Sequence, residues 1–67
     1  MDMTLLKAEI EGSGIPIVEV ARSANIKRGT LYYRFEHPET WRVNEMVGII
    51  TTLQMPKHKQ VEIFGLK

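Results

Sequence analysis

Cationic and aromatic side chains of the kinds that bind nucleic acid lie close together near the middle of this 67-residue chain. Lys27, Arg28 and Arg34 can donate hydrogen bonds to phosphate oxygens, and an arginine can bond guanine O6 and N7 at the same time. Tyr32 and Tyr33 add a hydroxyl group for a phosphate and a ring for a thymine methyl group. Side chains of these types at this spacing favour contact with a nucleic acid.

The charge of the chain supports this interpretation through its distribution more than through its sum. Nine Lys and Arg against eight Asp and Glu leave a formal net charge of only +1, whereas affinity for DNA depends largely on neutralised phosphates. The cations cluster around residues 16–36, whereas several acids lie outside that segment. The clustered cations are Arg22, Lys27, Arg28, Arg34 and Arg42, and the outlying acids are Glu9, Glu11, Glu45 and Glu62. The competing interpretation is that all of these are solvated surface charges.

Enzyme chemistry has little support in the sequence. His37 and His58 lie far apart, and no Ser-His-Asp pattern, phosphate-binding loop or metal-spaced cluster accompanies them. The chain has no cysteine, so neither disulfides nor a thiolate metal site can stabilise it. We therefore expect no enzyme activity, no metal and no cofactor. Without a long apolar run or a signal peptide, we expect a cytoplasmic protein that does not enter a membrane.

Two short helices are expected to position the basic and aromatic side chains. The first covers about residues 16–24, and the second covers about residues 28–35. Ala21 is small enough to let the second helix pack across the first, and Asn25 tolerates the left-handed backbone of a tight turn. Ile26 then enters the core, and Leu31 and Phe35 form the buried stripe of the second helix. The pattern is that of a helix-turn-helix over about residues 16–36.

Three further helices are expected around this motif. The first covers residues 5–11, with Thr4 as its N-cap and Gly12-Ser13-Gly14 as its end. The next begins near Asn44 and carries the strongest helical periodicity, at Met46, Ile49, Ile50 and Leu53. Trp41 and Val43 are expected to fold back onto the core just before it.

The carboxy-terminal segment, residues 57–66, allows two interpretations. Val61-Glu62-Ile63 alternates like a strand. However, Pro56 suits the first turn of a helix, and residues 57–60 contain no β-branched side chain. We favour a helix over residues 57–64.

The segment Asn25-Ile26-Lys27-Arg28-Gly29-Thr30-Leu31-Tyr32 resembles the helix-turn-helix of Cro/C1-type (XRE-like) bacterial and phage repressors, with Ala21 at the matching position before the turn. Residues 41–46 and the Ile63-Phe64 ending more loosely resemble short phage regulators of this kind. The resemblance implies one all-α, five-helix, lambda-repressor-like domain over residues 1–67. It also implies a transcriptional regulator, typical of a phage or prophage switch, that binds a double-stranded DNA operator. Such a regulator is often a homodimer, and the exposed end Ile63-Phe64-Gly65-Leu66 is our first candidate for its dimer surface.

The resemblance also assigns roles to individual residues. The helix over about residues 28–35 would enter the major groove. Its expected base-facing residues are Lys27, Arg28, Gly29, Tyr32 and Tyr33, and its expected phosphate contacts are Thr30, Arg34, Arg22 and Arg42. For Arg28 the competing role is a solvated helix-start cation, for Gly29 a frayed first turn, and for Tyr32 a place at the edge of the core.

One departure from the family pattern supports a different function. The first motif helix usually starts with a glutamine that bonds a phosphate, but this chain has Ile17 followed by Val18. These two apolar side chains could instead form an interaction patch. The alternative function is a protein-binding modulator that pairs with a partner repressor and binds DNA weakly or not at all. A purely structural or assembly role has only the small size of the chain in its favour.

Overall fold

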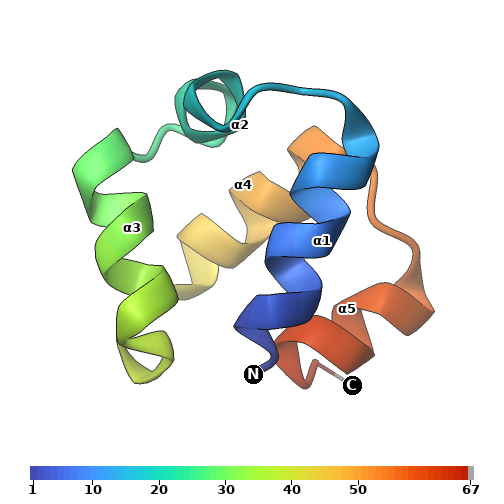
Figure 1. Cartoon of the computed structure of the whole chain (residues 1–67). Helices are drawn as coiled ribbons and strands as arrows, with labels where there is room; N and C mark the ends of the chain where they lie inside the picture. The colour runs from blue at the N-terminus through green and yellow to red at the C-terminus, as the bar shows by residue number, and fades with distance from the viewer. Residues whose placement is uncertain (67) are drawn as a thin grey trace.

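The computed structural model describes residues 1–66, and every regular element in that part of the chain is helical. The expectation of an all-α fold is therefore confirmed, including the helix favoured for the carboxy-terminal segment. Helices α1 and α4 cross in the middle of the molecule, α2 and α3 lie to one side and α5 closes the other end (Figure 1). The elements are α1 (Met3–Ser13), α2 (Ile17–Ser23), α3 (Arg28–Glu36), a 3₁₀ turn (Pro38–Thr40), α4 (Val43–Leu53) and α5 (Lys57–Phe64).

Helix α1 begins two residues earlier than the sequence suggested. The side chain of Asp2, rather than that of Thr4, accepts a hydrogen bond from the backbone N–H of Leu5 at 2.9 Å. The prediction of Thr4 as the cap was wrong because an acidic side chain was already available two residues upstream, where it also suits the positive end of the helix dipole. The helix ends at Gly14, whose φ of 75° is left-handed.

One apolar core joins all five α-helices. Its most deeply buried side chains are Leu6, Val20, Leu31, Ile49 and Ile63, one from each helix. Figure 1 shows how the crossed helices surround this common centre. Burying one such large aliphatic side chain contributes about 1.5–3 kcal/mol relative to leaving it exposed.

Trp41 and Val43 were both expected to fold back onto the core, but only Trp41 does so. Trp41 is 7% exposed, and its indole N–H donates to the sulfur of Met3 at 3.3 Å. Its ring also meets that of Phe64 edge-on, with centroids 5.3 Å apart. Val43, at 72% exposure, points to solvent. The prediction for Val43 was wrong because, as the first residue of α4, it lies about 120° around the helix from the fully buried Ile49 and on the same side as the exposed Val47.

The proposed dimer surface at the carboxy-terminal end is also corrected. Ile63 and Phe64 are 0% and 5% exposed, so these two side chains belong to the core. In addition, the carbonyl of Ile63 accepts a hydrogen bond from the N–H of Asp2 at 2.8 Å, which ties α5 to the start of α1. A helical rather than extended backbone turns both residues inward, so they offer no surface to a second chain.

Helix α4 comes close to the end of α2 at a glycine. A Cβ atom built on Gly48 would lie 2.7 Å from the carbonyl oxygen of Ala24 and 3.1 Å from its Cα atom. Gly48 and the small side chain of Ala24 therefore set the distance between α4 and the end of α2.

None of the helices in residues 1–66 has the length and apolar character needed to span a membrane.

Candidate nucleic-acid interface

The turn between α2 and α3 has the backbone that the sequence predicted. Asn25 adopts the left-handed conformation with φ 59°. The N–H of Ile26 then donates to the carbonyl of Ala21 at 2.8 Å, and the Ile26 side chain is 5% exposed. Because the turn is bonded to α2 and anchored in the core, it fixes α3 relative to α2, and the two helices cross steeply (Figure 1).

The start of α3 is open to solvent and positively charged. Lys27 occupies the N-cap position, where it makes no capping hydrogen bond through its side chain, and the first turn of α3 has no acidic residue. Both Lys27 and Arg28 are exposed. Within residues 1–66 their side chains make no ion pair or hydrogen bond. Unpaired backbone N–H groups and two cations at one helix start form a surface that favours an anion.

Gly29, Tyr32 and Tyr33 occupy the solvent-facing side of α3. Nothing lies within 4 Å of the place where a Cβ atom of Gly29 would be. Tyr32 and Tyr33 are 46% and 51% exposed. On a helical wheel Gly29 lies between them, three and four residues before the tyrosines. The exposed side of α3 therefore has no side chain at its centre, where Gly29 lies, and has a tyrosine ring on either side of it.

Both tyrosine rings also lie near rings that follow closely in the sequence. Tyr32 meets Phe35 edge-on, with centroids 6.2 Å apart, so its ring does extend the edge of the core. The ring of Tyr33 lies 4.5 Å from that of His37, and the guanidinium carbon of Arg34 lies 5.9 Å from it. These neighbours orient rings that remain half exposed.

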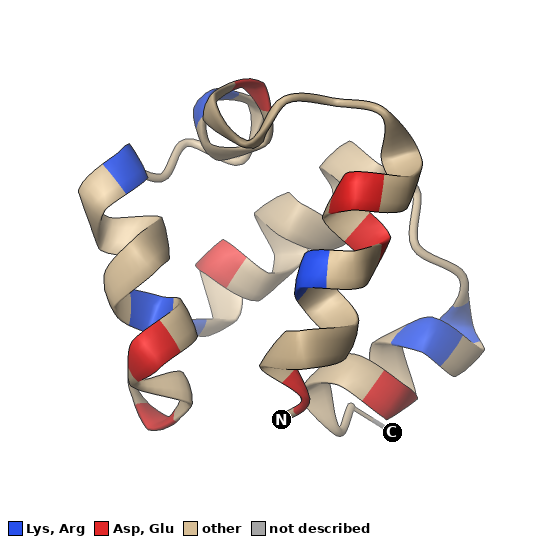
Figure 2. Ribbon diagram, viewed as in Figure 1, with Lys and Arg blue, Asp and Glu red and all other residues tan. Residues whose placement is uncertain are grey.

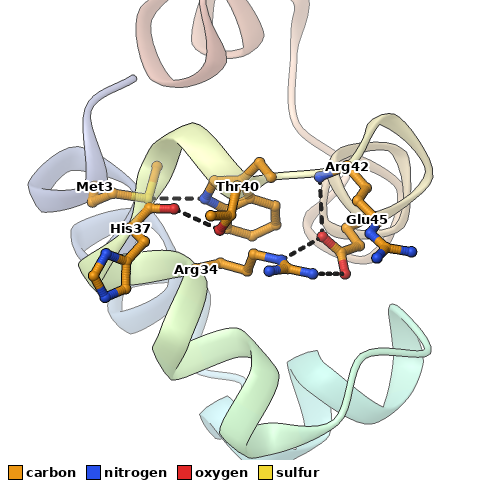
Figure 3. Close-up of polar contacts among 7 residues, drawn as sticks. Met3, Arg34, His37, Thr40, Arg42 and Glu45 are labelled. Atoms are coloured by element: carbon orange, nitrogen blue, oxygen red, sulfur yellow. Dashed lines mark hydrogen bonds and ion pairs between the residues drawn. The ribbon is translucent and has the colours of Figure 1, made fainter.

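Arg34 is held by a residue that the sequence placed among the outlying surface acids. Its Nε atom donates to Glu45 Oε1 at 2.8 Å and its Nη2 atom donates to Oε2 at 3.2 Å, as Figure 3 shows. Each side chain is only 12% exposed. Glu45 Oε1 also accepts from the backbone N–H of Arg42 at 3.0 Å, at the start of α4. The hydrogen bonds from Arg34 lower the pKa of Glu45, and the bond to Glu45 raises the pKa of Arg34.

This pair joins α3 to the beginning of α4, and no sequence signal indicated it. Arg34 and Glu45 are 11 residues apart and belong to different helices. Neither helical periodicity nor a local motif connects two such positions. With Nε and Nη2 bonded to Glu45 and only 12% of its side chain exposed, Arg34 has little capacity left for the phosphate contact that the sequence assigned to it.

The other expected phosphate contacts lie around α3. Arg22 is exposed on α2 and forms an ion pair with Glu19 at 2.6 Å; that bond raises its pKa. A surface pair of this kind contributes little to stability, so Arg22 can exchange partners at small cost. Thr30 is half-buried and Arg42 is exposed just before α4.

Charge is not uniform along α3. Figure 2 shows positive charge at its beginning and again shortly before its end, where the cation is Arg34, which pairs with Glu45; acidic segments lie at its end and in the following turn. Those acids are Glu36 and Glu39, both exposed. A polyanion would therefore be attracted to the first half of α3 and repelled from its last turn.

The two residues of the alternative patch differ in their surroundings. Val18 is 48% exposed and borders a shallow hollow whose other walls include Arg22, Lys27 and Arg28. Ile17 is half-buried and packs against the core. Only Val18 is thus available as an apolar contact, and it lies directly beside the cations.

No protein-family model, curated protein or solved structure matches this chain. Within residues 1–66 no group of three or more His, Asp or Glu side chains is arranged to hold a metal ion. The function proposed below therefore depends on the arrangement of α2, the turn and α3.

Proposed function

We propose that this protein is a sequence-specific, double-stranded DNA-binding transcriptional regulator of the Cro/repressor kind, acting in a phage or prophage switch. In this proposal α2 and α3 form a helix-turn-helix and α3 enters the major groove. The main support for this proposal is the exposed start of α3. There, uncapped backbone N–H groups and the unpaired cations Lys27 and Arg28 lie beside Gly29, which has no side chain. A helix presented in this way suits the width of the major groove.

Arg28 is the principal base-reading residue in this proposal. Its guanidinium can bond guanine O6 and N7 together, which is worth about 1–3 kcal/mol of discrimination against another base. Gly29 lets the helix backbone approach the base edges, and Tyr32 and Tyr33 contact thymine methyl groups or phosphates on either side. Lys27 reaches a base or a phosphate.

In this proposal the contacts to the DNA phosphates come from Arg22, Thr30 and Arg42, which lie on or near α3 and are not buried in the core. Arg34 acts instead through its ion pair with Glu45, which holds α3 against α4. This division leaves the phosphate contacts to Thr30 in the first turn of the reading helix and to Arg22 and Arg42 outside it. They fix its register, while its exposed side reads the sequence.

A second candidate function is favoured by one observation, the exposed Val18 beside the hollow. It is the protein-binding modulator, which would pair with a partner repressor through this surface. The two functions require different residues. A DNA regulator needs Arg28 and tolerates a polar residue at position 18, whereas a protein-binding modulator needs Val18.

Fluorescence anisotropy with matched variants tests the proposal. Arg28→Gln and Lys59→Gln remove the same charge, but Lys59 lies on α5, where it pairs with Glu9 at 3.1 Å. We expect Arg28→Gln to weaken binding to a preferred duplex about 5- to 150-fold, as the loss of about 1–3 kcal/mol requires. Lys59→Gln should change it less than about twofold, because Lys59 lies on α5, outside the proposed DNA-binding surface.

The salt dependence gives an independent readout. If Arg22, Lys27 and Arg42 each neutralise a phosphate, log K should fall with log salt at a slope of about −3. Arg42→Gln should reduce that slope by about one and weaken binding to all duplexes alike.

Equal effects of Arg28→Gln and Lys59→Gln on binding, or no binding even at low salt, would contradict the proposal. A Val18→Gln variant that loses a protein partner would then support the modulator.

A further inference from the structure

The exposed ring of Tyr33, near the end of α3, lies against a histidine that the proposed interface does not include. The ring centroids of Tyr33 and His37 are 4.5 Å apart, and the two planes are inclined by 37°. Tyr33 is still 51% exposed, so the contact orients the side chain without burying it. Aromatic pairs at this separation attract each other, so the imidazole favours one orientation of the tyrosine ring.

His37 is itself held in place by several contacts. Its N–H donates to the carbonyl of Tyr33 at 2.9 Å, and its carbonyl accepts from the hydroxyl and the N–H of Thr40 at 2.6 Å and 2.9 Å (Figure 3). Pro38 follows it and disfavours a helical backbone at His37, whose φ is −128° and ψ is 72°. Its ring nitrogen Nδ1 lies 3.8 Å from Oε2 of Glu39. The imidazole is therefore a fixed support for the ring of Tyr33.

The contacts of the Tyr33 ring leave its hydroxyl as the free part of the side chain. Besides His37, the guanidinium carbon of Arg34 lies 5.9 Å from the ring centroid, and Arg34 is bonded to Glu45. Within residues 1–66 the Tyr33 hydroxyl makes no hydrogen bond. Because a phenol hydroxyl is a hydrogen-bond donor, this one is available to an acceptor outside the chain.

We infer that His37 is a positioning residue for DNA binding, because it holds Tyr33 with its hydroxyl directed to a phosphate oxygen of the DNA. The inference rests on the proposed function, since it requires α3 to lie in the major groove. Tyr33 follows Arg28 by five residues, which is about 7.5 Å along the helix axis. That distance corresponds to about two base-pair steps, so the two residues contact separate points on the DNA.

A neutral donor suits this part of α3. Glu36 and Glu39 nearby are acidic and exposed, and Arg34, the cation of the last turn, is paired with Glu45. Charge attraction therefore does not hold the end of α3 to a polyanion. A hydroxyl that is already oriented can bond a phosphate there without first losing rotational freedom, which strengthens the contact.

Fluorescence anisotropy with a preferred duplex tests this role of His37. Without the imidazole, the side chain of Tyr33 can spread over about three χ1 rotamers, so His37→Ala should weaken binding about two- to threefold. His37→Phe keeps a ring at this position and should restore wild-type binding. His58→Ala is the matched control: it removes the other histidine, which is exposed on α5, and should bind like the wild type.

Double variants separate the positioning of Tyr33 from a general structural role of His37. Tyr33→Phe should weaken binding about 2- to 10-fold through the loss of one hydrogen bond. Since no hydroxyl then remains for His37 to position, adding His37→Ala should cause no further loss. The ring of Tyr32 lies against Phe35 instead, so the losses from Tyr32→Phe and His37→Ala should add.

Methylphosphonates, which replace one charged phosphate oxygen by a methyl group, identify the acceptor. When each phosphate of the duplex is replaced in turn, one position should weaken binding of the wild type but not of Tyr33→Phe. Additive losses from Tyr33→Phe and His37→Ala, or a His37→Phe variant as weak as His37→Ala, would overturn the inference, while specific binding by the wild type would keep the proposed function. A wild-type chain that binds no duplex would overturn both.

Discussion

Replacing Gly48 by alanine should destabilise the protein, although alanine is the better helix former. The new Cβ atom would lie 2.7 Å from the carbonyl oxygen of Ala24 and 3.1 Å from its Cα atom. These are backbone atoms, so no side chain can rotate to relieve the contact, and α2 must move away from α4. Overpacking of this kind costs about 3 kcal/mol, and the higher helix propensity of alanine returns about 1 kcal/mol. The expected net loss is about 2 kcal/mol.

That loss is large for a chain of 67 residues, whose whole stability is about 3–10 kcal/mol. It should lower Tm by roughly 8–16 °C. Gly12→Ala is the matched control, because Gly12 also lies in a helix and nothing surrounds the position of its Cβ atom within 4 Å. Gly12→Ala should raise stability by about 0.5–1 kcal/mol.

Urea unfolding of both variants, followed by circular dichroism, measures the difference. The two substitutions are chemically identical, so opposite signs can come only from what surrounds each glycine. Two variants that are both more stable than the wild type would refute the close α2–α4 contact and with it the packing that positions α3.

Two further predictions concern the polar contacts. Glu45→Gln should lower stability at neutral pH, because Arg34 holds the pKa of Glu45 below its ordinary value and the folded state therefore gains from the ionised form. This stabilisation is present above about pH 4.3, the ordinary glutamate pKa, and is lost as pH falls through the lower pKa of the folded state. Unfolding free energies measured at pH 7 and pH 3 should show that the variant is less stable than the wild type by a smaller amount in acid. A stability difference that grows in acid would contradict the ion pair. Asp2→Ala should cost about 1 kcal/mol through loss of the α1 cap, whereas Thr4→Ala should change the unfolding midpoint little; the reverse order in thermal unfolding would restore Thr4 as the cap.

Local rules predicted much of the fold. Asn25 and Ile26 defined the turn because each position has a distinct backbone or burial requirement, and the periodic row at Met46 and Ile49 marked α4. The segment with Val61 could be assigned to a helix once Pro56 was taken as its start. In each case the information lies within about one helical turn of the residue concerned.

The remaining features depend on contacts between helices, which the sequence does not display. The pairing of Arg34 with Glu45 needs the angle between α3 and α4, so the sequence could offer only two surface charges. Val43 was placed in the core by its apolar character, but its position at the start of α4 turns it outward. Ile63 and Phe64 were placed on a dimer surface, whereas the docking of α5 against α1 buries them.

Sequence-specific binding can be measured by selecting bound DNA from a randomised duplex pool at low and physiological salt. We expect salt-sensitive retention of duplexes that share a short motif containing a guanine, and loss of preference at that guanine in the Arg28→Gln variant. Retention of DNA without any enriched sequence, or no retention at low salt, would contradict a sequence-specific regulator.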